Sequence, residues 1–354
     1  MSQTCPELME NSTLARKWTN PKDRLPAIRT MSQHNHTDEN PRNPGTELDL
    51  DWALAVQANT SAIERRCKAL PGRRSIKKVN QAAWLLKAIT CIDLTTLSGD
   101  DTEDRVRRLC RKARFPVRAD LLDALELEPG SITTGAICVY HEMVPAAVSA
   151  LEGTDIPVAA VSTGFPAGLS PYSLRLAEIG ESIKAGAKEI DIVISRRHVL
   201  SQDWQALYDE MKAFREACGD AHVKAILATG ELGTLRNVAR ASLICMMAGA
   251  DFIKTSTGKI SPAATMPVTL VMLEAIKDHY LKTGRKIGMK PAGGISNAKT
   301  AIQYLVMLHE TLGSDWMDNS LFRFGASSLA NNVLMQILKQ DTGNYQSPDY
   351  LSIG

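Results

Sequence analysis

The feature that most constrains the fold of this chain is an alternation of short apolar runs with long amphipathic segments, repeated eight times. The apolar runs are typical of buried strands and span residues 88–93, 135–140, 156–162, 189–195, 223–228, 251–255, 286–291 and 322–325. The amphipathic segments that follow them span residues 102–114, 141–151, 171–185, 202–218, 235–248, 266–281, 297–312 and 328–338. Nearly continuous apolar strands joined by helical crossovers predict a parallel sheet that is covered by helices.

Eight strand–helix units in about 250 residues are the number that closes a (β/α)8 TIM barrel. We therefore predict an α/β barrel domain over residues 47–340, with an N-terminal helical extension. One helix of the extension is expected over residues 50–63 and another around residues 82–86. Residues 1–46 are polar without an apolar period, which predicts disorder, and residues 341–354 are predicted to form a flexible tail. An open doubly wound sheet is the alternative, but no GxGxxG follows the first strand.

The composition argues against several classes of function. There are 41 Lys and Arg against 39 Asp and Glu, and only 5% aromatic residues, so a dedicated nucleic-acid binder is not expected. There is no apolar run of about 18 residues to span a membrane, and the N-terminus lacks the apolar run of a secretory signal. The seven cysteines are odd in number and form no CxxC, which indicates reduced thiols rather than disulfides or a zinc site. We expect a cytoplasmic protein without a metal, a membrane or a nucleic-acid partner.

Charged side chains stand inside the apolar runs, where burial is costly unless the charges are paired or used. They are Asp93, Asp191, Lys224, Lys254 and Lys290. In a barrel the chemistry collects where strands end and loops begin. One such charge alone fits a structural ion pair equally well. Five in one barrel interior are difficult to explain as packing, and they predict an active site.

Two of the lysines, Lys254 and Lys290, are expected at matching depth on the sixth and seventh strands. A lysine amine attacks carbonyl groups only when it is deprotonated, and its ordinary pKa is about 10.4. Burial and a neighbouring cation both lower that pKa. This pair therefore predicts Schiff-base chemistry, in which one lysine stays charged and the other forms an iminium. The iminium accepts electrons during carbon–carbon cleavage, and a carboxylate moves the proton.

Glycine-rich loops after the last three predicted strands indicate an anion site. Glycine lets backbone N–H groups approach a ligand, and the loops after strands seven and eight often bind phosphate in barrels. A helix N-terminus also favours negative charge. The candidate phosphate-binding residues are Gly258, Lys259, Gly293, Gly294, Ser327 and Ser328.

Several motifs resemble those of the deoxyribose-phosphate aldolase family, which are Schiff-base (class I) aldolases of barrel fold. The motifs are residues 93–97 (DLTTL), 136–140 (AICVY), 189–193 (EIDIV), 228–232 (ATGEL), 251–259 (DFIKTSTGK), 288–295 (GMKPAGGI) and 324–329 (FGASSL). The resemblance spans roughly residues 47–340 and is nearer to the animal branch of the family. The 251–259 motif is close to diagnostic.

The resemblance implies a reversible cleavage of 2-deoxy-D-ribose 5-phosphate to D-glyceraldehyde 3-phosphate and acetaldehyde, in deoxyribose phosphate catabolism. Its partner would be this small phosphorylated sugar, with no metal or organic cofactor. By the same resemblance, Lys254 would form the Schiff base, Lys290 would be the neighbouring ammonium, and Asp191 would move protons. The supporting residues would be Asp93, Lys224 and Thr95.

The chain departs from the family pattern at Ser296, where the family often has Arg, so this position does not offer that charged phosphate contact. Two other functions stay open at this point: another Schiff-base barrel aldolase of transaldolase type, and a barrel that acts as a scaffold without catalysis. Whether the chain forms a homo-oligomer is also open. Some members of the family carry a C-terminal tyrosine that enters the active site, and Tyr350, rather than Tyr345, is our candidate.

Overall fold

The computed structural model describes residues 41–347 and residue 351, and in these the predicted barrel is confirmed. The strands are β1 (Ile92–Thr95), β2 (Ala136–Tyr140), β3 (Val158–Ser162), β4 (Glu189–Val193), β5 (His222–Ile226), β6 (Phe252–Lys254), β7 (Gly288–Lys290) and β8 (Phe324–Ala326). They form one parallel sheet in the order β7-β6-β5-β4-β3-β2-β1-β8. Parallel bridges from Met289 to Phe322 and from Ala292 to Gly325 join the two ends of the sheet and close the barrel.

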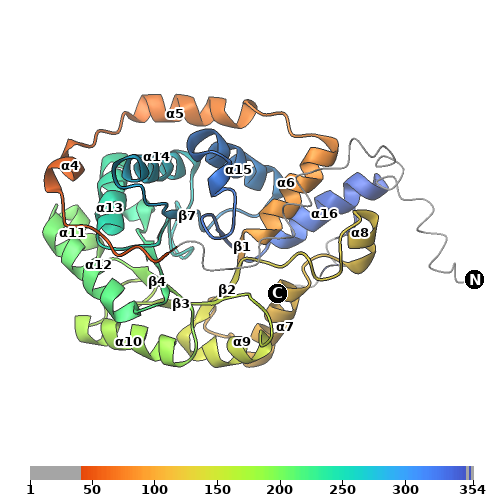
Figure 1. The fold of residues 1–354 in the computed structure, drawn as a ribbon, viewed down its shortest axis with the longest axis horizontal. Coiled ribbons are helices and arrows are strands. Elements are labelled where there is room, and N and C mark those ends of the chain that lie inside the picture. Colours follow the sequence, from red (N-terminus) through yellow and green to blue (C-terminus); the bar gives the residue numbers. More distant parts are fainter. Residues whose placement is uncertain (1–40, 348–350, 352–354) are drawn as a thin grey trace, which may run out of the picture.

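Helices surround the strands on the outside of the barrel (Figure 1). After β1 these are α7 (Glu103–Arg114), α8 (Ala119–Ala124), α9 (Val144–Ala150), α10 (Tyr172–Lys184), α11 (Arg196–Leu200), α12 (Trp204–Cys218), α13 (Leu235–Met247), α14 (Met266–Thr283), α15 (Ala298–Leu312) and α16 (Leu329–Thr342). Five of them begin at a polar residue whose side chain accepts a hydrogen bond from the first turn, which satisfies an otherwise unpaired N–H group. These capping residues are Thr102, Asp203, Thr234, Thr265 and Asn297.

The N-terminal extension differs from the prediction of one helix over residues 50–63. The structure has two helices there, α4 (Leu50–Ala55) and α5 (Thr60–Ala69), because Asp49 and Asn59 each cap a separate N-terminus. Helix α5 packs on the outer side of α14 (Figure 1). The packed chain also begins before residue 47, since the buried Asn43 amide donates to the carbonyls of Met246 (2.7 Å) and Ala250 (3.0 Å). The rest of the segment predicted to be disordered, residues 1–40, lies outside the described residues.

Two boundaries in the structure differ from those predicted from the sequence. Residues 88–90 belong to α6 (Lys78–Thr90) rather than to the first strand, because the apolar run there is the buried face at the end of that helix. At the other end, α16 continues to Thr342, into the predicted tail. The short helices α8 and α11 were not predicted, since one and a half turns leave no readable period. No helix within the described residues is long and apolar enough to cross a membrane.

Strand register places the charged residues together inside the barrel. Asp191 on β4 pairs with Lys224 on β5, and Lys254 on β6 pairs with Lys290 on β7. Residues that are paired in a parallel sheet project to the same face. Aliphatic side chains fill the layer between strands and helices, whereas these four side chains lie in the barrel interior and are at most 3% exposed. The register therefore assembles the candidate site.

Candidate active site

The predicted strand-end charges converge on the carboxylate of Asp191. Its Oδ2 accepts hydrogen bonds from Lys254 Nζ at 2.7 Å and from Lys290 Nζ at 2.8 Å. Its Oδ1 lies 3.3 Å from Lys224 Nζ. The structure thus brings together the three residues expected to carry the chemistry, and one of the three expected to support it.

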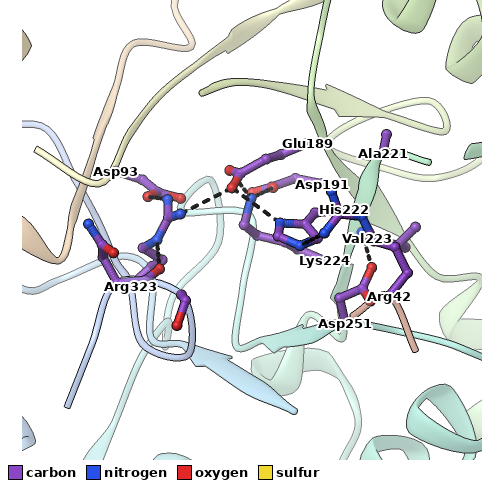
Figure 2. Close-up of polar contacts among 12 residues, drawn as sticks. Arg42, Asp93, Glu189, Asp191, Ala221, His222, Val223, Lys224, Asp251 and Arg323 are labelled. Carbon is purple, nitrogen blue, oxygen red and sulfur yellow. Dashed lines mark hydrogen bonds and ion pairs between the residues drawn. The ribbon is translucent and has the colours of Figure 1, made fainter. Parts of the chain in front are cut away.

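Two further charged residues join this group and were not assigned to the site from the sequence. Figure 2 shows Arg323 reaching from the start of β8 toward both Asp93 and Glu189. Its Nη1 lies 2.6 Å from Asp93 Oδ1, and its Nη2 lies 3.1 Å from Glu189 Oε1. Glu189 also pairs with Lys224. The signal that could have identified Arg323 is its place between two phenylalanines in an apolar run, a position where a guanidinium needs a partner.

Asp93 and Thr95 on β1 occupy the places expected of supporting residues. Asp93 Oδ2 lies 2.5 Å from Lys290 Nζ, so this lysine stands between the carboxylates of Asp93 and Asp191. The Thr95 hydroxyl donates to the Asp93 carbonyl at 2.8 Å, which fixes the end of the strand.

The two paired lysines differ in their electrostatic surroundings. Burial lowers the pKa of Lys254; Asp191 acts in the opposite direction, and the ammonium of Lys290 lowers the pKa further. Burial also disfavours the charge of Lys290, but Asp191 and Asp93 outweigh it and raise the pKa of Lys290 above its usual value. Lys254 is therefore the better amine and Lys290 the persistent ammonium, as burial and neighbouring charge dictate.

The carboxylate of Asp191 stays ionised under ordinary conditions. Its burial acts to raise its pKa, but Lys254, Lys290 and Lys224 lower that pKa far below the usual value. A proton that reaches Asp191 is consequently passed on rather than retained. Among the described residues, no group of three or more His, Cys, Asp or Glu side chains is placed to hold a metal ion.

A cavity of about 420 Å³ opens above these charges and contains the predicted phosphate residues. Lys254 and Thr95 line it from below, while Asp93, Asp191, Lys224 and Lys290 are not part of its lining. The loops after β6, β7 and β8 contribute Gly258, Lys259, Gly293, Gly294, Ser327 and Ser328. Lys254, whose pKa is lowered, therefore faces the same space as the candidate anion site.

Backbone geometry explains why glycines are used in these loops. Gly258, Gly293 and Gly294 all have positive φ angles (77°, 84° and 81°), which residues with a Cβ rarely adopt. At Gly293 a Cβ would also lie 2.6 Å from that of Ala263. Ser328 precedes the first turn of α16, whose free N–H groups and positive dipole end favour an anion.

Besides Lys254, two basic side chains line the same cavity, although Ser296 offers none. Lys259 follows Gly258, and Arg105 projects from the first turns of α7. Arg105 Nη1 lies 3.4 Å from carboxylate oxygens of both Asp100 and Asp101, so these pairs hold it at the rim. Arg105 was not predicted, because only the fold brings α7 beside the loops after β7 and β8.

The wall of the barrel interior on the side of β2 and β3 is small and apolar. Leu97, Cys138, Ala159 and Val161 form a separate buried cluster there. The Cys138 thiol lies 3.9 Å from Asp191 Oδ2, and burial raises the pKa of this thiol. Cys138 therefore acts as a protonated, space-filling side chain beside the charged group.

The tail residues are placed away from the cavity where they are described. Tyr345 is 62% exposed; the ammonium of Lys339 lies 3.9 Å from its ring centroid, and its hydroxyl is 3.3 Å from Gln336 Oε1. Tyr350, the candidate to enter the site, lies outside the described residues. Leu351 is buried and lines a second cavity of about 790 Å³ between α7, α8 and α16.

Comparison with known proteins shows which family the chain matches. Residues 87–331 match the DeoC/LacD family of aldolases. The chain belongs to this family. A deoxyribose-phosphate aldolase of Mus musculus is 57% identical over 303 residues, covering 85% of this chain and 95% of the mouse protein. The Homo sapiens deoxyribose-phosphate aldolase is 55% identical over 305 residues, covering 86% and 96% of the two chains.

Solved structures of aldolases share the fold. The deoxyribose phosphate aldolase of Aeropyrum pernix, described as a tetramer, superposes with a TM-score of 0.55 at 22% identity, covering 76% of this chain and 96% of its own. An aldolase named QR15 gives a TM-score of 0.56 at 26% identity, with coverage of 72% and 96%. The barrel is thus that of the family, while the finer features of the site come from this chain's own residues.

Proposed function

We propose that this family member is a deoxyribose-phosphate aldolase that reversibly cleaves 2-deoxy-D-ribose 5-phosphate to D-glyceraldehyde 3-phosphate and acetaldehyde. One observation carries the proposal. Lys254, with a lowered pKa, shares Asp191 with the ammonium of Lys290 and faces a cavity lined by three glycine-rich loops. The mouse and human relatives bear the name of this activity.

Lys254 is the residue that forms the covalent intermediate. Its neutral Nζ attacks the aldehyde carbon C1 of the open-chain sugar, and loss of water from the carbinolamine gives an iminium. The C2–C3 bond then breaks. Its electron pair moves toward the iminium to form an enamine, while the C3 hydroxyl loses its proton and becomes the aldehyde of the released triose phosphate. Protonation of the enamine at C2 and hydrolysis give acetaldehyde and restore Lys254.

Lys290 and Asp191 move protons in this scheme. The Lys290 ammonium keeps its charge and is a nearby proton donor to the departing carbinolamine hydroxyl. Asp191 Oδ2, in contact with both lysines, passes protons between them and a bound water that reaches the substrate. The iminium is itself the electron sink, so the scheme needs neither a metal nor an organic cofactor.

The cavity supports a phosphorylated rather than a free sugar. The backbone N–H groups around Gly258, Gly293 and Gly294, together with the start of α16, form an anion cup in the cavity that Lys254 also lines. Two serines add hydroxyl donors there. We therefore assign the 5-phosphate to this cup.

We also place the protein in deoxyribose phosphate catabolism in the cytoplasm. The six cysteines within the described residues are all buried and free, which supports a reducing compartment. Borohydride reduction in the presence of 2-deoxyribose 5-phosphate, followed by mass spectrometry of the digested protein, tests the central assignment. We expect the two-carbon adduct of acetaldehyde on the peptide containing Lys254.

Lys254→Arg is the matched control, since it keeps a cation but forms no imine. If this variant cleaved the substrate at a rate near that of the wild type, or if borohydride trapped another lysine, the mechanism would be wrong. Activity with acetaldehyde as the donor separates this enzyme from a transaldolase-like aldolase. A scaffold role gives no reason for three lysines to be buried in one barrel interior, where each requires a carboxylate.

A further inference from the structure

The charged groups beneath the cavity form a closed ring in which cations and carboxylates alternate. In order around the ring they are Arg323, Asp93, Lys290, Asp191, Lys224 and Glu189. Glu189 returns the ring to Arg323, and Figure 2 shows these closing contacts. Four of the contacts are hydrogen bonds. The two others, Lys290 to Asp93 and Lys224 to Asp191, are ion pairs by distance without hydrogen-bond geometry.

The ring is electrically balanced by itself, with three cations and three carboxylates. All six side chains are 2% exposed or less, so solvent does little to screen or replace any member. Lys254 is attached from outside the ring, through Asp191 Oδ2 at 2.7 Å. That oxygen also accepts from Lys290, so Lys254 has no carboxylate of its own.

We propose that Arg323 and Glu189 are positioning residues, which close this ring and so leave Lys254 as the one buried Lys or Arg, among the described residues, without a compensating charge of its own. The proposal rests on the function assigned to Lys254 above, and it adds that the whole ring, rather than Lys290 alone, selects the nucleophile. Neither Arg323 nor Glu189 lines the cavity, so both act through other residues.

The role of Arg323 follows from the permanence of its charge. A guanidinium does not deprotonate in a protein, whereas a buried lysine can. Arg323 therefore always neutralises part of the negative charge of Asp93 and Glu189. The negative charge that remains on these two carboxylates stabilises the ammonium groups of Lys290 and Lys224. Its two-pronged contact also sets the distance between β1 and β4 across the barrel.

The charged and titratable groups that act on Lys254 directly are Asp191 on β4, Lys290 on β7 and Cys138 on β2. Lys224 on β5 acts on Asp191, and Asp93 on β1 acts on Cys138, so both lie one contact further away. Arg323 and Glu189 act on it through the ring. Loss of Arg323 leaves two ring cations against three carboxylates, and an ammonium on Lys254 restores the balance. Loss of Glu189 leaves three ring cations against two carboxylates, and this excess of positive charge disfavours an ammonium on Lys254.

The experiment measures the pH dependence of imine formation in single turnovers, by borohydride quenching of the full-length enzyme mixed with 2-deoxyribose 5-phosphate. In Arg323→Met we expect the ascending limb to move upward by about one pH unit. This is the lower end of the roughly one to three units that a charge in direct contact produces, because Arg323 acts on Lys254 through the ring. Below the limb this is a loss of about tenfold in rate. Glu189→Gln should show no upward shift.

The double variant Arg323→Met/Glu189→Gln is the decisive control, because it again has equal numbers of ring cations and carboxylates. We expect its limb to return toward the wild-type position. If the two residues had a purely structural role, the losses of rate caused by the two substitutions would add in the double variant. The upward shift of the limb in Arg323→Met would then not be reversed by Glu189→Gln. Near-UV circular dichroism and thermal unfolding verify that each variant is folded.

An unmoved limb in folded Arg323→Met, or a larger upward shift in the double variant, overturns the inference. If Arg323→Met does not fold, an upward shift in Glu189→Gln or in the double variant overturns it instead. Failure of the proposed function itself is distinguished by the wild-type protein. If borohydride does not label Lys254 there, the function is wrong, whereas labelled Lys254 with an unmoved limb refutes only the ring.

Discussion

Replacement of Lys290 by methionine is the perturbation whose size can be worked out from the structure. The two ammonium nitrogens contact the same atom, Asp191 Oδ2, at 2.7 and 2.8 Å. They therefore lie no more than 5.5 Å apart, the sum of these contacts. Lys290→Met removes the nearest like charge from Lys254 while keeping a side chain of similar length in the barrel.

Two unit charges at this distance repel by about 3 kcal/mol at an effective dielectric constant of about 20. Since each pKa unit corresponds to about 1.4 kcal/mol, the pKa of Lys254 should rise by about 2 units in the variant. The sign follows because repulsion disfavours the ammonium, so its removal favours it. Burial, the largest cause of the lowered pKa, is retained in the variant and continues to oppose the charge on Lys254.

The assay is the rate of imine formation as a function of pH, measured by rapid borohydride quench under single-turnover conditions. This step is chosen because Lys290 also donates protons later in the proposed cycle, which would obscure the pH profile of overall turnover. We expect the ascending limb to move upward, with a fall of up to about a hundredfold at a pH below the limb. Lys290→Arg keeps the charge and should leave the limb near its wild-type position. A limb that stays in place in folded Lys290→Met would refute the electrostatic role of Lys290.

Other predictions follow from the cavity and from the buried carboxylates. Ser328→Asp places a negative charge at the start of α16 and should raise KM for 2-deoxyribose 5-phosphate much more than KM for free deoxyribose. Equal increases for both substrates would contradict the assignment of the phosphate to this site. Arg105→Gln removes a rim cation and should raise the same KM severalfold with little change in kcat, whereas a fall in kcat alone would contradict this role. The pKa values of Asp93, Glu189 and Asp191 are lowered by their cations, so these groups stabilise the fold above the ordinary carboxyl pKa of about 4, and the free energy of unfolding in urea should fall as the pH decreases below it.

The barrel could be predicted from the sequence because its signal is local. Each crossover helix has an apolar stripe of several turns, and each strand is a short run buried on both faces. The prediction failed where the local pattern was ambiguous. Residues 88–90 are apolar in a way that suits either the last turn of α6 or the start of β1, and only the packing of that turn decides between them. Helices of five or six residues, such as α8 and α11, carry too few positions to show a period.

The candidate site was predictable to the extent that its charges interrupt apolar strands. Lys254, Lys290 and Asp191 stand out in this way. The strand register pairs Lys254 with Lys290, and both amines contact Asp191 Oδ2. Arg323 and Glu189 were not assigned to the site. Arg323 stands immediately before β8 and Glu189 is the first residue of β4, and a charge at the beginning of a strand is ordinarily exposed. Their contact joins residues that are 134 positions apart, and it exists only once the barrel closes between β7 and β8. Closure is a property of the whole sheet, which no single motif encodes.

The ring also explains why, of three buried lysines, Lys254 is the one suited to attack the substrate. Lys224 lies between Glu189 and Asp191, and Lys290 lies between Asp93 and Asp191, so each has carboxylates on two sides. Lys254 shares a single oxygen with another cation, and of these three lysines it alone lines the cavity. An amine needs both a lowered pKa and access to the carbonyl carbon, and either one without the other gives no imine. The register that pairs Lys254 with Lys290 supplies the neighbouring cation, and the position of Lys254 in the cavity lining supplies the access.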